Sequence, residues 1–322
     1  MTLNRRTAMA ALTAMALVPA QACATGWPTK PVTIYVTTAA GGNTDLMARM
    51  AADYLSAKFG KTFVVENRPS AGGVQASGQV VNAAPDGHTM LFTPSTAILL
   101  APLVQKMPFD PDKSLTPVTN VGTGSQVIAI KRSLPVNNLA EFLAYAKANP
   151  KKLNFAAAGT NNLSHLAPLL LFARAGVDVV MVPSRGEPQA ISDLMAGNVD
   201  FYFGNTSVLL SQKDHPAIKL LAVGTAQRIP SAPDLPTASE TIPGFVFASW
   251  NGLLVPNGTP DDIIEKVRGA ITDMVKAPEM SARLIGLGIL PGGQSKEQVA
   301  AVFESDRKNF ADAVKAAGIP AP

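Results

Sequence analysis

The chain has 322 residues, 47% of them hydrophobic and 16% charged, which allows two domains of ordinary size and excludes a disordered chain. Its single cysteine excludes both a disulfide framework and a cysteine-based zinc site. Lys and Arg number 27 against 23 Asp and Glu, an excess too small for a nucleic-acid-binding surface.

Residues 1–24 have the pattern of a secretory signal peptide: Arg5 and Arg6, an apolar stretch over 8–18, then small residues. This stretch is shorter than the roughly 20 residues that span a bilayer as a helix. The two arginines fit export by the twin-arginine route as well as by the Sec route. We therefore predict a periplasmic protein whose mature chain carries 25 basic against 23 acidic residues.

Cys23 lies at the end of this leader and has two interpretations. It is either removed with the leader or becomes the lipid-modified first residue of the mature chain. The residues before it lack the leucine that usually precedes a lipidated cysteine, which favours removal.

Short β-branched segments then alternate with amphipathic segments of helical period almost to the end of the chain. Strands are predicted at 32–38, 62–66, 89–93, 126–130, 153–157, 177–182, 199–204, 220–225 and 246–255. Helices are predicted at 45–58, 74–83, 139–148, 163–175, 187–196, 260–276, 278–286 and 295–317. This alternation predicts an α/β fold of mixed, mostly parallel sheets with helices on both faces.

Nine strands exceed what one small open sheet needs, so two α/β lobes are expected. The Gly-rich stretch 119–124 and the Pro-rich stretch 225–236 are the predicted crossing points. Residues 25–122 and 226–322 would form the first lobe, and residues 123–225 the second. A cleft between two lobes is a common place for a ligand site.

Three predicted strands are followed by a loop of small residues and then a helix, around 39–45, 69–73 and 158–165. A helix N-terminus presents unpaired N–H groups, and glycine lets an anion approach the backbone closely. A tight turn alone would also explain each glycine. Two such loops on different lobes favour a shared anion, and the absence of G-x-x-x-x-G-K-[S/T] and G-x-G-x-x-G motifs favours a small metabolite over a nucleotide.

Motifs along the whole mature chain resemble the Bug (TctC-like) extracytoplasmic solute receptors of tripartite tricarboxylate transporters. They are Ala39-Ala40-Gly41-Gly42 with Asp45 and Arg49, Val64-Val65-Glu66-Asn67-Arg68-Pro69, Pro85-Asp86-Gly87, Pro108-Phe109-Asp110-Pro111, Ala146-Lys147-Ala148-Asn149-Pro150, Trp250-Asn251-Gly252 and Gly258-Thr259-Pro260. The resemblance implies a type II periplasmic binding protein fold, a two-lobe Venus flytrap, with no catalysis and no cofactor or metal. It implies a receptor that binds a small carboxylate and delivers it to membrane permease subunits. We expect the protein to be a monomer.

In this family the first loop and the corresponding loop of the second lobe grip a carboxylate. Carried over, these are Ala40, Gly41, Gly42, Asn43, Thr44 and Asp45 in the first loop and Ala158, Gly159, Thr160, Asn161 and Asn162 in the second. The predicted ligand-binding residues also include Thr93, Ser95, Arg185 and Asn205. Asp45 would either favour the helix dipole or bind an amino group of the ligand. Arg185 would either pair with a distal carboxylate or lie free on the surface. The sequence departs from the family pattern at Asn161-Asn162 and at Ser184-Arg185-Gly186. These departures leave undetermined which chemical group the ligand carries at its other end.

Two other functions compete with the receptor. A secreted α/β hydrolase or transferase acting on an organic acid would need a nucleophile and a base. The chain has three histidines and no H-E-x-x-H or G-x-S-x-G motif. Ser305 and Lys308 match S-x-x-K only by chance, on a charged helix. A sensory receptor that presents its ligand to a membrane kinase would have the same binding site.

Overall fold

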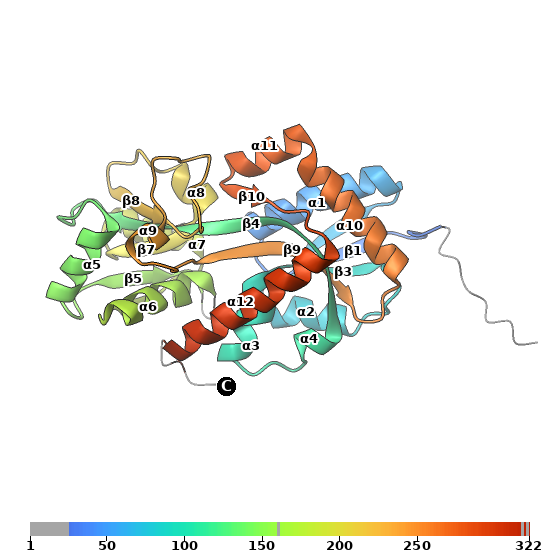
Figure 1. Ribbon diagram of the computed structural model, residues 1–322, viewed down its shortest axis with the longest axis horizontal. Helices are drawn as coiled ribbons and strands as arrows, with labels where there is room; N and C mark the ends of the chain where they lie inside the picture. The colour runs from blue at the N-terminus through green and yellow to red at the C-terminus, as the bar shows by residue number, and fades with distance from the viewer. Residues whose placement is uncertain (1–25, 160–161, 317–318, 320–321) are drawn as a thin grey trace, which may run out of the picture.

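The computed structural model describes residues 26–159, 162–316, 319 and 322. Two lobes lie side by side, joined by the long strands β4 (Leu115–Lys131) and β9 (Ala248–Pro256) (Figure 1). The predicted signal peptide with Cys23, and the predicted ligand residues Thr160 and Asn161, lie outside the described residues. No helix in the described ranges is long and apolar enough to cross a membrane.

The first lobe is a sheet in the order β2-β1-β3-β9-β4, with β10 paired to β4. Helices α1 and α10 cover one face, and α2 and α12 cover the other. Its remaining elements are β1 (Val32–Val36), α1 (Asn43–Phe59), β2 (Phe63–Asn67), η1 (Ala71–Gly73), α2 (Val74–Val81), β3 (Thr89–Pro94), η2 (Thr96–Leu100), α3 (Ala101–Val104), α4 (Pro111–Ser114), α10 (Asp261–Lys276), α11 (Pro278–Gly286), β10 (Ile289–Pro291) and α12 (Lys296–Ala316). Helix α1 follows from its pattern, because Met47, Ala51 and Leu55 recur at helical spacing and are fully or almost fully buried against the sheet.

The second lobe is a sheet in the order β4-β7-β5-β6, with β8 also paired to β4. Helices α5 and α6 pack on one face through Phe142 and Phe172, and α7 packs on the other through Leu194. The elements are α5 (Leu139–Ala148), β5 (Asn154–Ala157), α6 (Leu163–Ala175), β6 (Val180–Pro183), α7 (Glu187–Ala196), β7 (Phe201–Asn205), α8 (Thr206–Leu210), β8 (Ile218–Val223) and α9 (Ala238–Thr241).

Strand β4 belongs to both lobes. Its residues 115–125 pair with β9, and its residues 126–131 pair with β7 and β8. The sheet is mixed, as predicted, but parallel pairs do not predominate: among the described strands four pairs are parallel and five are antiparallel. The reason is that β4 and β9 carry the chain between the lobes in opposite directions, and both contribute to the antiparallel pairs.

The boundaries of the two lobes stay a prediction, which the core packing refines. The change of partners within β4 lies between Ser125 and Gln126, close to the predicted crossing at residue 122. The predicted return at residue 225 precedes Phe245 and Phe247, which pack in the core of the second lobe. We therefore propose that the chain returns to the first lobe at the start of β9.

Helix α12 extends from the first lobe to the second (Figure 1). Its Phe303 packs on Trp250 of β9 with ring centroids 4.5 Å apart. Near its end, Val314 joins Leu100 of η2 and Leu166 of α6 in a small cluster of buried side chains. One helix thus contacts both lobes on the same side of the molecule.

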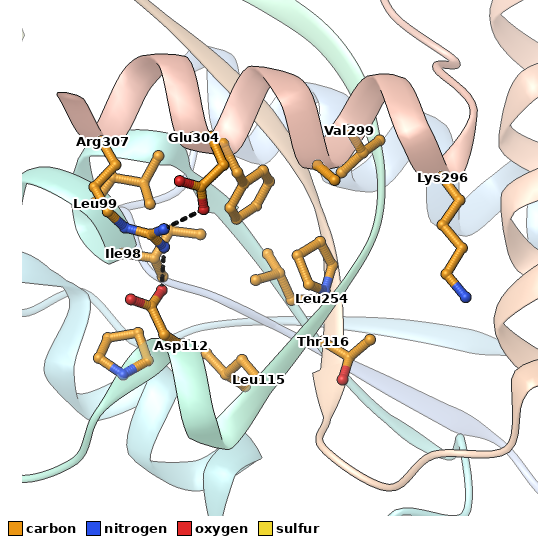
Figure 2. A pocket seen from close by; sticks show the side chains of 14 residues that line it. Ile98, Leu99, Asp112, Leu115, Thr116, Leu254, Lys296, Val299, Glu304 and Arg307 are labelled. Atoms are coloured by element: carbon orange, nitrogen blue, oxygen red, sulfur yellow. Dashed lines mark hydrogen bonds and ion pairs between the residues drawn. The ribbon is translucent and has the colours of Figure 1, made fainter. Parts of the chain in front are cut away.

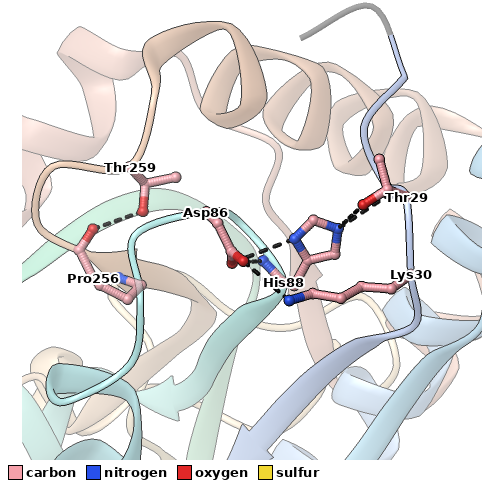
Figure 3. A network of polar contacts seen from close by, with 6 residues as sticks. All are labelled: Thr29, Lys30, Asp86, His88, Pro256 and Thr259. Carbon is pink, nitrogen blue, oxygen red and sulfur yellow. Dashed lines mark hydrogen bonds and ion pairs between the residues drawn. The ribbon is translucent and has the colours of Figure 1, made fainter. Parts of the chain in front are cut away.

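A polar network ties the segment before β1 to the turn before β3 (Figure 3). The Thr29 N–H donates to His88 Nε2 at 3.2 Å, and Lys30 Nζ lies 3.2 Å from Asp86 Oδ2. His88 lies in that turn and is not among the residues that line the interlobe cavity described next.

Candidate ligand-binding site

A cavity of about 810 Å³ lies between the lobes. The first lobe contributes residues 38–44, and the second contributes residues 162–164 and 185–188. Strand β4 adds residues 124–126 where it changes lobes. The N-terminal ends of α1, α6 and α7 therefore face one space. The loops before α1 and α6 are the two that the sequence pattern placed on different lobes, whereas the start of α7 was not among them.

The first loop presents the start of α1 to this cavity. No side chain caps the helix at Gly42, so its first-turn N–H groups are left for another acceptor. Gly41 has φ of +87°, in the left-handed region that favours glycine. Together these features leave the positive end of the helix dipole open to an anion.

Asp45 holds this loop in place. Its carboxylate accepts hydrogen bonds from the Gly41 N–H (2.9 Å), Arg49 Nε (3.0 Å) and Asn67 Nδ2 (2.9 Å). Burial raises the pKa of Asp45, but the bonds from Arg49, Gly41 and Asn67 outweigh it and bring the net pKa below its ordinary value. With 2% of its surface exposed, Asp45 supports the loop and does not line the cavity.

The loop before α6 is closed by its own side chains. Asn162 Oδ1 caps the helix by accepting from the His165 N–H at 3.1 Å, and it also accepts from Ser164 Oγ at 2.8 Å. Asn162 Nδ2 donates to the Ala158 carbonyl at 3.0 Å. The side chain of Asn162 therefore reaches the cavity in a fixed orientation.

Two charged side chains, Arg185 and Glu187, stand among the described lining residues. Arg185 is exposed at the rim, and no ion pair to its guanidinium is found within the described part of the chain. Glu187 begins α7 and accepts from the Asn205 N–H (2.7 Å), Asn205 Nδ2 (2.6 Å) and the Tyr202 hydroxyl (3.4 Å). Burial raises the pKa of Glu187, and these three hydrogen bonds oppose the shift.

Polar side chains from the first lobe and from β4 complete the lining. Asn251 Oδ1 accepts from Thr44 Oγ1 at 2.7 Å, and Asn43 Oδ1 accepts from Ser207 Oγ of the opposite lobe. Gln126 is 7% exposed, and its Oε1 has no hydrogen-bond partner; the buried Thr38 Oγ1 also has none. Buried polar atoms without partners in a cavity are available to a ligand.

The predicted site residues divide into two groups. Nine line the cavity: Ala40, Gly41, Gly42, Asn43, Thr44, Ala158, Asn162, Arg185 and Asn205. Asp45, Thr93, Ser95 and Gly159 do not; Thr93 is bonded to Thr37 and Ser95 to Ser249, each pair at 2.9 Å between hydroxyl oxygens. Glu187, Gln126, Ser249 and Asn251 are lining residues that the sequence reasoning missed. For Glu187 a signal existed, since it follows Arg185-Gly186 in the same strand–glycine–helix pattern.

A second cavity, of about 390 Å³, lies beneath α12 in the first lobe (Figure 2). Its walls are largely apolar, and Arg307 at its edge is paired with Glu304 at 2.7 Å and with Asp112. None of its described lining residues comes from the second lobe. The interlobe cavity is therefore the better candidate for a polar ligand.

Comparison with known proteins agrees with this geometry. The profile of the tripartite tricarboxylate transporter family receptors, TctC, matches residues 47–319. The chain belongs to this family. Protein BugT of Bordetella pertussis is 28% identical over 95% of this chain and 94% of its own length. A UPF0065 protein of Bordetella bronchiseptica is 31% identical over 98% of this chain and 93% of its own.

Solved structures of similar proteins confirm the fold of this TctC-family receptor. The R. palustris protein Rpa4515, solved with adipate, has a TM-score of 0.85 at 30% identity, covering 92% of this chain and 99% of that one. MatC from Rhodopseudomonas palustris, with bound malate, has a TM-score of 0.79 at 31% identity, covering 89% and 100%. The periplasmic binding protein BugD has a TM-score of 0.80 at 31% identity, covering 91% and 99%. The receptor has a periplasmic binding protein fold, and its family is one of binding proteins and not of enzymes.

Proposed function

We propose that this receptor captures a small carboxylate in the cavity between its lobes and delivers it to the membrane permease subunits of a tripartite tricarboxylate-type transporter. Export to the periplasm by the Sec or twin-arginine route and a monomeric state belong to the same proposal. The adipate and malate bound to the two R. palustris relatives support a carboxylate ligand.

The observation that carries the proposal is the meeting of helix N-termini from opposite lobes. The start of α1 has no side-chain cap, and the starts of α6 and α7 lie across the same cavity. An anion there would accept backbone hydrogen bonds at the positive ends of helix dipoles. Charge-assisted hydrogen bonds contribute about 1.5–3 kcal/mol each, so a few of them account for roughly micromolar affinity.

Ligand-dependent thermal stabilisation tests the proposal directly. Carboxylates from four to six carbons should raise the melting temperature, because a ligand at about 100 times its Kd stabilises the folded protein by about 2.7 kcal/mol. Amines of equal length, such as 1,4-diaminobutane, should not. If none of the carboxylates shifts the melting curve at millimolar concentration, the proposed function is wrong.

The variant Asn162→Asp separates site binding from general effects. Aspartate caps helices as well as asparagine does, so the cap on the His165 N–H should persist while a negative charge enters the cavity and the bond from Asn162 Nδ2 to the Ala158 carbonyl is lost. We expect carboxylate affinity to fall by at least about tenfold, measured by calorimetry. Asn138→Asp is the matched control, because Asn138 caps α5 in the same way outside the cavity. Equal affinities for the two variants would remove the α6 loop from the site.

A further inference from the structure

Glu187 is a carboxylate in a cavity that otherwise favours anions. It occupies the first position of α7, next to Arg185 at the rim and within the lining shared by both lobes. An acidic residue in the first turn of a helix is favoured by the dipole, which explains the residue type. It does not explain why an acidic residue stands in the lining of a cavity that a negatively charged ligand would enter.

The donors that hold Glu187 leave part of its carboxylate free. Oε1 accepts from the Asn205 N–H and more weakly from the Tyr202 hydroxyl, whereas Oε2 accepts only from Asn205 Nδ2 within the described residues. Each carboxylate oxygen has two lone pairs, so Oε2 retains one acceptor position. Its orientation is fixed by β7, which also makes Glu187 part of the rigid wall of the second lobe.

A second acceptor lies beside it. Gln126 of β4 is the direct cross-strand partner of Asn205, and residues opposite each other on antiparallel strands have neighbouring side chains. Gln126 Oε1 is buried, has no hydrogen-bond partner and belongs to the same cavity lining. Gln126 Oε1 thus belongs to the same part of the lining as Asn205, to which the Glu187 carboxylate is bonded.

We propose that Glu187 determines specificity by accepting a hydrogen bond from the ligand, so that this receptor selects carboxylates bearing an ammonium or hydroxyl group. The inference rests on the proposed function and refines its ligand class. The α1 and α6 loops receive the carboxylate, and Glu187 with Gln126 receives the donor group. An unsubstituted chain would leave both acceptors without a partner when the cleft closes, and an unpaired buried acceptor is costly.

Matched ligands differing in one substituent test this proposal. Calorimetry at pH 7.5 would compare succinate with L-malate and L-aspartate, and glutarate with 2-hydroxyglutarate and L-glutamate. Each substituted acid should bind at least about tenfold more tightly than the unsubstituted acid of its set. A factor of about ten is what one hydrogen bond to a charged group contributes to affinity. The larger gain within each set shows whether the ligand group is a hydroxyl or an ammonium.

The variant Glu187→Gln should remove this preference. Affinity for the substituted acids should fall by about tenfold, while affinity for succinate and glutarate stays within about threefold or rises. The amide of the variant keeps one acceptor oxygen but loses the other acceptor for Asn205, so the melting temperature of the free variant is measured as well. A fall in melting temperature that leaves the ligand preference intact would mean that Glu187 only supports the fold. Glu279→Gln is the control, since Glu279 lies in the first turn of α11 with its side chain exposed.

The outcomes separate the two proposals. If the parent acids bind as tightly as the substituted ones, or if Glu187→Gln weakens all six ligands equally, Glu187 has no role in selection. In either case carboxylate binding itself stands. If none of the six acids binds the wild-type receptor, the proposed function fails and the role of Glu187 fails with it.

Discussion

Asp45 shows how a side chain shapes the site without touching the cavity. Its ion pair with Arg49 and its bond to the Gly41 N–H fix the turn that exposes the start of α1. Asp45 resembles a ligand-binding residue in the sequence because it follows the glycines directly. In the fold its carboxylate turns away from the cavity toward Arg49 and Asn67.

Replacing Asp45 by asparagine should therefore weaken both the fold and the binding. Loss of the charge-assisted bonds should lower the free energy of unfolding at pH 7 by about 1–3 kcal/mol, measured by urea titration. The pKa of Asp45 is lowered in the folded protein, so its contribution is present above the ordinary value of 3.8 and is lost as pH falls through the lower folded pKa. Asp53→Asn, exposed on the same helix, should have little effect. Equal stability of the Asp45 variant and wild type at pH 7 would contradict this role.

The residues that form the site were predictable only where they are local in sequence. Small residues before a helix mark Gly41 and Gly42 without knowledge of the fold. Ser249 and Asn251 lie more than 200 residues after this loop, and only the placement of β9 beside β3 brings them to the cavity. Ser95 and Thr93 were placed at the correct strand end, but their hydroxyls pair with other side chains inside the wall.

At the level of elements, the close contact of β4 and β9 depends on Gly252. A Cβ atom there would lie 2.5 Å from the Thr119 carbonyl oxygen and 2.9 Å from Asn120 Cα. Both are backbone atoms of β4, so a side chain at residue 252 would separate the two strands that join the lobes.

We expect Gly252→Ala to lower the free energy of unfolding by about 1–3 kcal/mol, as overpacking of a tight interface does. The matched control is Gly269→Ala in α10, where no atom lies within 4 Å of an added Cβ and the helix should gain about 0.5–1 kcal/mol. Thermal unfolding of both variants checks the prediction, which fails if they change stability in the same direction.

Helix α12 carries a carboxyl group whose burial has a measurable cost. Burial raises the pKa of Asp306 to about 6, and its contact with Trp250 partly offsets the shift. Between pH 3.8 and 6 the folded protein retains a proton that the unfolded chain has released, so this group lowers stability as pH rises through that range. Above pH 6 Asp306 is ionised in both the folded and the unfolded chain, and the loss of stability has its full size.

The variant Asp306→Asn should remove this cost. At pH 8 its free energy of unfolding should exceed that of the wild type by about 1–3 kcal/mol. Below pH 4 the two free energies should be equal. Urea titrations at both pH values measure the difference. The exposed Asp312→Asn on the same helix should show no such pH-dependent gain. A gain of the same size at pH 4 would show that ionisation is not its cause.

Helices were predicted best where the apolar residues recur at helical spacing and the residues at both ends are typical of helix termini. Helices α5, α6, α7 and α11 begin and end where the sequence placed them. The first half of β4 was missed, because Pro117, Gly122 and Gly124 interrupt the apolar pattern that identifies a strand. The three-residue β10 is too short to show any period.

At the level of the whole molecule, the two lobes share a strand, a cavity and a covering helix. The fold class could be predicted because alternating strands and helices have few compact arrangements. The excess of antiparallel strand pairs could not be predicted, because it depends on which strands lie beside β4 once the chain has passed to the second lobe and returned. The cluster of Leu100, Leu166 and Val314 likewise joins three distant segments that no local pattern links.

The position of β9 has a consequence for the order in which the chain can become structured as it is made. All the strands of the second lobe, β4 to β8, have ended by Val223. Strand β9 lies between β3 and β4 in the first lobe, so those two strands cannot take their final neighbours until residues 248–256 have been synthesised. The lobe that begins first is therefore completed last, and a chain interrupted before β9 holds two early strands that have no permanent partner between them.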